Sequence, residues 1–170
     1  LYHDLLKRTV DAIKNNSKFD LDDSLVKEIE INTGIPCVIP QTYLDDVHER
    51  LVFYKRISSA KNDDDLKELK IEMIDRFGLL PDSINNLFAS TSLRIFAEKI
   101  GITKINIFDD MAEITLSKNN YIEPTKIINL IQNSPQTYKL KNQNTLIFNA
   151  EMEGDYTRIE KVRTLAENLN

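Results

Sequence analysis

The sequence has few of the residues from which catalytic and ligand-binding motifs are built. Its four glycines stand singly, so neither a P-loop nor a dinucleotide fingerprint can form, because both need clustered glycines near phosphate. Its two histidines are far apart, and neither has the spacing of a metal site. No Gly-x-Ser-x-Gly nucleophile elbow occurs. We therefore expect that this chain is not an enzyme and holds no cofactor or metal.

Cysteine and long apolar runs are equally scarce. The single Cys37 excludes an internal disulfide bond and a multi-cysteine metal site, which favours a reducing, cytoplasmic location. We interpret it as a small packed residue rather than a nucleophile, since nothing in the sequence positions His48 beside it. No apolar run approaches the ~18 residues of a membrane span, and no signal-peptide pattern opens the chain. We therefore expect no membrane binding.

Basic residues are also fewer than acidic residues. Lys and Arg number 22 against 27 Asp and Glu, which gives a formal net charge of −5 at pH 7. Nucleic-acid binding needs clustered cations that neutralise phosphates, so we expect none by this chain. An acidic chain is better suited to a partner protein with a basic surface.

The length and composition suit one domain with a short appendage. A chain of 170 residues with 41% hydrophobic residues can bury a core of ordinary size. Residues 1–14 have the apolar spacing of a short amphipathic helix, and the polar run 15–24 resembles a linker. We therefore divide the chain into a helix and linker (residues 1–24) and a domain (residues 25–170). The chain opens in mid-pattern without Met, which indicates a fragment of a longer protein.

Three helical patterns dominate the first half of the domain, at residues 43–61, 63–77 and 81–100. Asn62 or Asp63 can cap the second, while Gly78 and Gly101 are suited to end the second and third. The second pattern has one apolar stripe, made of Leu66, Leu69, Met73, Ile74 and Phe77.

The first of these patterns is apolar on two sides. One side carries Leu44, Val47, Leu51, Tyr54 and Ser58, and the other carries Phe53 and Ile57. Such a helix is buried on both sides, or buried on one and docked on the other. We favour burial between neighbouring helices.

After Gly101 the apolar period changes from that of a helix to that of a strand. Two hairpins are predicted, at residues 102–116 and 138–148, each followed by a helix, at 124–132 and 156–169. Residues 25–31 suggest a further strand at a sheet edge, and two prolines make 35–40 extended. The predicted class is α+β: three long helices followed by a small antiparallel sheet of order ββαββα, covered on one face by helices.

The second helix also has an acidic side. Its residues Asp64, Glu68, Glu72 and Asp75 fall within one sector of roughly 100° of the helical wheel, with Ile71 at the edge. A charge run on a helix is most often a solvated face, and periodicity alone favours that interpretation. The alternative is a docking surface for a basic partner, with Ile71 as an apolar contact.

A longer motif runs through this region and gives the chain a family resemblance. Its residues are Arg50, Leu51, Phe53, Tyr54, Lys55, Arg56, Ile57 and Ala60, then Asp75, Arg76, Phe77, Gly78, Leu79, Leu80 and Pro81. The likeness extends to Leu1, Tyr2, Leu5, Leu6, Val10, Asp11 and Ala12, and to Thr157, Arg158, Ile159, Glu160, Val162 and Arg163. Together these segments resemble the carboxy-terminal domain of bacterial transcription-repair coupling factors. Residues 16–41 cannot be aligned by motif.

The resemblance implies a regulatory interaction domain. In that family a DNA translocase, which uses ATP and Mg²⁺, removes stalled RNA polymerase and recruits the excision-repair protein UvrA. Its carboxy-terminal domain folds back on an amino-terminal UvrB-like module, hides the UvrA-binding surface and restrains the motor. Carried over, Glu72 and Asp75 would pair with arginines of that module, and Glu68 and Ile71 join them by helical geometry alone. The alternatives are a passive structural cap on the motor and a free-standing adaptor.

Overall fold

The computed structural model describes residues 29–152 and 154–170 of the chain. The predicted helix at 1–14, the linker at 15–24 and the first residues of the predicted strand at 25–31 lie outside these residues. The described elements are, in chain order, β1 (Glu30–Asn32), α3 (Val47–Ser58), α4 (Asp63–Phe77), α5 (Asp82–Ile100), β2 (Ile102–Ile107), β3 (Met111–Leu116), α6 (Pro124–Asn133), β4 (Tyr138–Asn142), β5 (Thr145–Asn149) and α7 (Asp155–Leu169).

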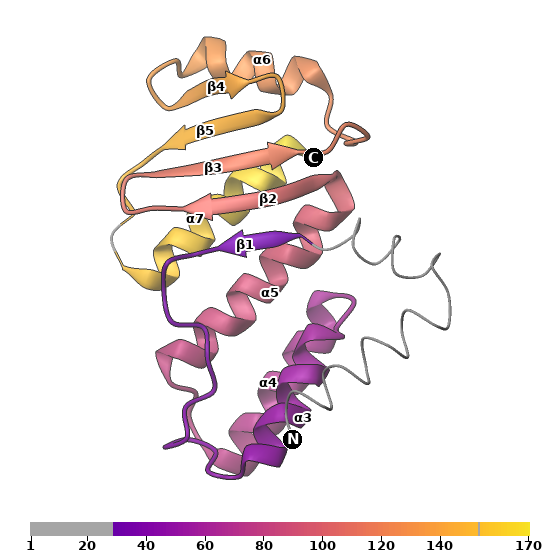
Figure 1. Ribbon diagram of the computed structural model, residues 1–170, viewed down its shortest axis with the longest axis vertical. Coiled ribbons are helices and arrows are strands. Elements are labelled where there is room, and N and C mark those ends of the chain that lie inside the picture. The colour runs from indigo at the N-terminus through magenta and orange to yellow at the C-terminus, as the bar shows by residue number, and fades with distance from the viewer. Residues whose placement is uncertain (1–28, 153) are drawn as a thin grey trace, which may run out of the picture.

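The strands form one sheet in the order β1-β2-β3-β5-β4 (Figure 1). The pairs β2–β3, β3–β5 and β4–β5 are antiparallel, as the sequence predicts. The edge strand β1 joins β2 in parallel, so the sheet is mixed. Parallel neighbours need a long crossover, and here the chain between β1 and β2 contains α3, α4 and α5. The predicted α+β class is confirmed.

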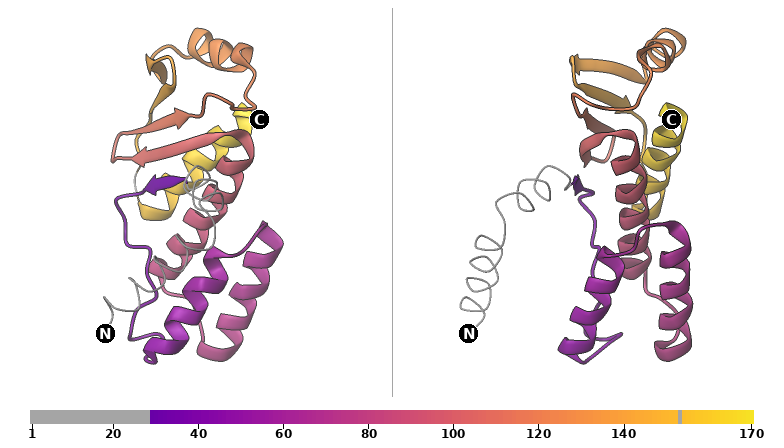
Figure 2. Two further views of the ribbon diagram at one scale, coloured as in Figure 1. Left: turned by 45° about the vertical axis from the view of Figure 1, so that its right-hand side comes forward. Right: turned by 90° about the vertical axis from the view of Figure 1, so that its right-hand side faces the viewer.

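The helices gather on one face of this sheet. Figure 2 shows α5, α6 and α7 on the same side of the strands, with α3 and α4 extending away from the sheet beside the first half of α5. Ile105 and Ile114 are fully buried and alternate with half-exposed neighbours along their strands. That alternation is what a sheet with one covered face requires.

Local signals in the sequence set the helix ends. The Asn62 side chain accepts a hydrogen bond from the Asp65 N–H and caps α4. Gly78 and Gly101 end α4 and α5 with φ of +96° and +89°, a region that favours glycine. At Gly101 the space is closed as well, because a Cβ would lie 2.5 Å from the Cα of Asn120.

Two hydrophobic clusters share α5 between them. The sheet cluster contains Leu93, Ala97 and Ile100 of α5, together with the inward side chains of the strands and of α7. The helical cluster contains Ile84 and Phe88 of α5, together with the inward side chains of α3 and α4. The domain therefore has a sheet unit and a three-helix unit, joined through one long helix.

The expected burial of the first long helix on both of its apolar sides is wrong, because only one side is covered. Asp46 caps α3, so the helix begins at Val47 and not at residue 43. Its buried face is Phe53 and Ile57, at 2% and 1% exposure, whereas Val47 and Leu51 are 59% and 61% exposed.

The side that begins at Leu44 is shorter in the structure than the sequence suggests. Leu44 is buried, but it lies in the turn before the helix and does not mark a helical face. The side that carries the aromatic ring of Phe53 is covered instead. This ring packs edge-on against the ring of Phe77, with 5.8 Å between the two ring centres. Ile74, which the sequence assigns to the core stripe of α4, is 41% exposed.

Candidate functional site

The candidate surface lies on the outer side of α4. Leu66, Leu69 and Met73 point into the helical cluster, so the opposite side of the helix faces outward. Glu68, Ile71 and Asp75 are exposed there, and Glu72 is half-exposed at the flank nearer α3. We call these four residues the acidic surface. The structure therefore brings together all four residues that the sequence singles out.

Glu72 is the one member of the acidic surface that is bound by neighbouring arginines. Arg56 of α3 donates two hydrogen bonds to its carboxylate, at 2.6 and 2.8 Å, and Arg76 donates a third at 3.4 Å. Arg76 also pairs with Glu49 of α3 at 3.1 Å. The hydrogen bonds from Arg56 hold the pKa of Glu72 below its usual value, against the opposing effect of burial.

Aromatic rings hold these arginines in place. The guanidinium carbon of Arg76 lies 4.8 Å from the ring centre of Phe77 and 5.5 Å from that of Phe53. Arg56 lies 5.2 Å from the ring centre of Phe53. Stacking of this kind orients the planar guanidinium group. The Glu49–Arg76–Glu72–Arg56 network thus fixes α3 against α4.

The remaining carboxylates of the acidic surface are open. Among the described residues, no ion pair or hydrogen bond is formed by the side chains of Glu68 and Asp75. Ile71 is 52% exposed beside them, and Leu79, just past the end of α4, is 88% exposed. An open depression of about 360 Å³ runs along Glu68 and Glu72 to Arg56. The acidic surface thus combines unpaired negative charge with exposed apolar side chains.

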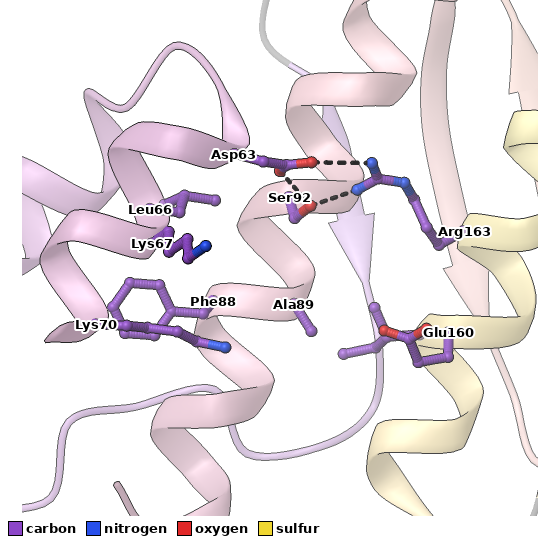
Figure 3. A pocket seen from close by; sticks show the side chains of 10 residues that line it. Asp63, Leu66, Lys67, Lys70, Phe88, Ala89, Ser92, Glu160 and Arg163 are labelled. Carbon is purple, nitrogen blue, oxygen red and sulfur yellow. Dashed lines mark hydrogen bonds and ion pairs between the residues drawn. The ribbon is translucent and has the colours of Figure 1, made fainter. Parts of the chain in front are cut away.

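The opposite flank of α4 borders a different hollow, which the sequence does not reveal. A groove of about 230 Å³ lies between α4 and α5 on one side and α7 on the other (Figure 3). At its end Asp63 accepts hydrogen bonds from the Ser92 hydroxyl at 2.6 Å and from Arg163 at 3.2 Å. Arg163 also donates to the Ser92 hydroxyl and pairs with Glu167.

This Asp63–Ser92–Arg163 triad connects α4, α5 and α7. The hydrogen bond from Ser92, with the hydrogen bond and charge of Arg163, lowers the pKa of Asp63 against the opposing effect of burial. Asp63 and Arg163 are 100 residues apart, so no local spacing signals their contact. The triad joins the three-helix unit to the sheet unit.

Two kinds of site are absent from the described part of the chain. Within residues 29–152 and 154–170, no three His, Cys, Asp or Glu side chains gather where they could hold a metal ion. None of the described helices is both long and apolar enough to cross a bilayer.

This chain is similar to transcription-repair-coupling factors of several bacteria. The family model of the TRCF domain matches residues 33–127. The transcription-repair-coupling factor of Escherichia coli (strain K12) is 38% identical over 99% of this chain and 15% of its own length. The factor of Haemophilus influenzae is 35% identical over 99% and 15%, and that of Buchnera aphidicola from Acyrthosiphon pisum is 32% identical over 99% and 21%.

A solved structure has the same fold. The crystal structure of the C-terminal domain of a transcription-repair coupling factor superposes with a TM-score of 0.70 at 21% sequence identity, covering 84% of this chain and 91% of the other. This chain spans only 15% to 21% of the length of the relatives named above.

Proposed function

Because this chain belongs to the TRCF domain family of bacterial transcription-repair coupling factors, we propose that it is their non-catalytic regulatory domain. In this proposal the acidic surface of α4 docks on the amino-terminal UvrB-like module of the same parent protein. Docking masks the UvrA-binding surface of that module and restrains the ATPase and translocase activity of the parent. The parent uses ATP and Mg²⁺ and engages DNA, and contact with stalled RNA polymerase releases the restraint.

The observation that carries this proposal is the open charge on the acidic surface. Glu68 and Asp75 have no partner among the described residues, and Ile71 is exposed between them. A solvated helix face gains nothing from exposed isoleucine, whereas a docking surface combines apolar contact with complementary charge. Arginines are the matching groups, because the guanidinium fork fits a carboxylate.

The network around Glu72 gives this residue a different role from its neighbours. Its carboxylate already receives three hydrogen bonds from Arg56 and Arg76. A partner arginine at Glu72 must therefore share the carboxylate or displace Arg56. Asp75 and Glu68 provide the charge that attracts the partner, and Glu72 fixes α4 in the orientation that presents them.

The mechanism is a shift between closed and open populations of the parent. The closed state is favoured by the docked surface, and polymerase binding favours the open state. A few kcal/mol of docking energy is enough to move such an equilibrium from mostly open to mostly closed. A polar contact of this strength is weakened by salt, because exposed charges are screened over ~8 Å at physiological ionic strength.

The test is titration calorimetry of this chain against the isolated UvrB-like module at low and high salt. We expect binding that weakens strongly at high salt. The double variant Glu68→Lys/Asp75→Lys should abolish it, and the matched control Glu98→Lys, an exposed acid on α5, should leave it unchanged. Unchanged binding by the double variant would refute docking through the acidic surface.

The alternative is a passive cap that stabilises the end of the motor. This alternative predicts that deleting residues 25–170 from the parent leaves its ATPase rate unchanged and lowers only its thermal stability. The regulatory proposal predicts a higher ATPase rate in the absence of polymerase.

A further inference from the structure

The groove between α4 and α7 is built differently from the acidic surface. Its floor consists of buried apolar side chains, Leu66, Phe88 and Ile159. Its α4 side carries two cations, Lys67 and Lys70, with the ammonium of Lys70 lying 5.5 Å from the ring centre of Phe88. We call this hollow the basic groove. An apolar floor beside cations is the pattern of a site that takes an apolar group next to a negative charge.

The cations of the basic groove are available to a ligand. Within the part of the chain that the structure describes, neither Lys67 nor Lys70 forms an ion pair. Arg163, by contrast, is already engaged by Asp63, Ser92 and Glu167 at the end of the groove. Lys67 and Lys70 are therefore the cations lining the groove that have no ion-pair partner among the described residues.

A carboxylate on the α7 side of the groove determines which way round a charged ligand can bind. Glu160 of α7 lines the groove opposite the lysines, as Figure 3 shows. Its charge repels an acidic group on the α7 side and leaves the α4 side as the place for one. The volume of about 230 Å³ accommodates one large apolar side chain.

We propose that the basic groove is a second docking surface, which binds a segment of a partner protein that presents an apolar side chain next to a carboxylate. Charge complementarity favours an acidic partner here. The chain as a whole has a net charge of −5, but the two side chains on this flank of α4 that form no ion pair among the described residues, Lys67 and Lys70, are positively charged. The two flanks of α4 thus bind partners of opposite charge. This inference is independent of the regulatory proposal, because none of the four residues of the acidic surface lines the groove.

The test uses NMR titration of the ¹⁵N-labelled chain with three capped tetrapeptides. They are acetyl-Asp-Leu-Phe-Asp-amide and its neutral and basic counterparts, with Asn or Lys in place of Asp. We expect the acidic peptide to shift the amides around Phe88, Ser92 and Ile159, with a dissociation constant on the order of 1 mM, which corresponds to a binding free energy of about −4 kcal/mol. The neutral and basic peptides should bind at least about tenfold more weakly.

Variants of the chain test whether the peptide binds at the two lysines, and other probes test for other kinds of ligand. Lys67→Glu/Lys70→Glu should abolish the shifts, while Lys118→Glu, an exposed lysine past β3, and Asp75→Lys should not. Three outcomes would overturn the proposal: equal binding of the three peptides, stronger shifts at the groove from a single-stranded oligonucleotide, or self-association of the chain that the double lysine variant removes.

Discussion

The structure predicts that substitutions of Glu72 and Asp75, three residues apart on α4, have different effects. Glu72 stabilises the domain, because it holds α3 and α4 together through Arg56. Asp75 is exposed and without a partner among the described residues, so its removal costs the fold almost nothing. Glu72→Gln should therefore lower stability, and Asp75→Asn should lower affinity for the UvrB-like module.

The magnitudes follow from exposure and geometry. The side chains of Arg56 and Glu72 are 43% and 35% exposed, so their bidentate pair is worth at most about 1 kcal/mol in spite of its short contacts. In a domain of this size that loss lowers the melting temperature by about 2–4 °C. Neutralising one exposed carboxylate at an interface costs about 0.2–1 kcal/mol, or up to about fivefold in affinity.

The assay pairs calorimetric melting of the chain with titration against the UvrB-like module. Glu72→Gln should melt earlier and bind within about twofold of the parent chain, whereas Asp75→Asn should melt within about 1 °C of it and bind more weakly. A double-mutant cycle with Arg56→Gln checks the cause, since the coupling energy with Glu72 should equal most of the stability loss. If Glu72→Gln weakened binding at an unchanged melting temperature, the division of roles between the two carboxylates would be wrong.

Three further predictions concern the fold. Gly101→Ala should destabilise the domain by more than Gly78→Ala in thermal melting, since both residues have positive φ, worth roughly 1–3 kcal/mol of strain, but only the former meets a neighbouring backbone. Phe53→Ala should cost about 3–5 kcal/mol and Leu51→Ala less than about 0.5, measured by urea unfolding, because only the first is buried. Asp63 has a lowered pKa in the folded state, so its stabilising effect is full above its unfolded pKa of about 4 and is lost as the pH falls through the folded value. The melting-temperature advantage of the parent chain over Asp63→Asn should accordingly shrink between pH 7 and pH 3.

The order of elements was predictable because its signals are local. The caps at Asn62, Gly78 and Gly101 depend on residues within one turn of the helix end. The hairpins follow from apolar alternation on either side of short polar turns. The edge position of β1 was predicted, but its parallel pairing with β2 was not, since that pairing depends on how the intervening helices pack.

The expected burial of both sides of α3 was wrong, and the reason is physical. Both sides of this helix carry apolar residues, so periodicity cannot choose between them. The choice depends on tertiary burial, which favours the aromatic surface of Phe53 over Leu51. Leu44 belongs to neither side of the helix, because it lies before the Asp46 cap.

The position of the candidate site on α4 was predictable, but the ion pairs of its carboxylates were not. The helical wheel places Glu68, Ile71, Glu72 and Asp75 on one side of α4 because that geometry depends on spacing alone. The wheel does not show that Glu72 is bound by Arg56, 16 residues earlier on a different helix. Contacts between elements decide which carboxylates are open, and the sequence contains no local signal for them.

The placement of both surfaces on α4 has a consequence for how the domain can respond to a partner. α4 belongs to the helical cluster and α7 to the sheet cluster, so no shared core fixes one to the other. Their connection runs through α5 and through the Asp63–Arg163 pair at the end of the basic groove. A segment that enters this groove contacts α4 and α7 at once and therefore acts on the junction of the two units. Glu68 and Asp75 point away from that junction and form no ion pair among the described residues, so charge changes at these two positions should alter docking without loosening the domain.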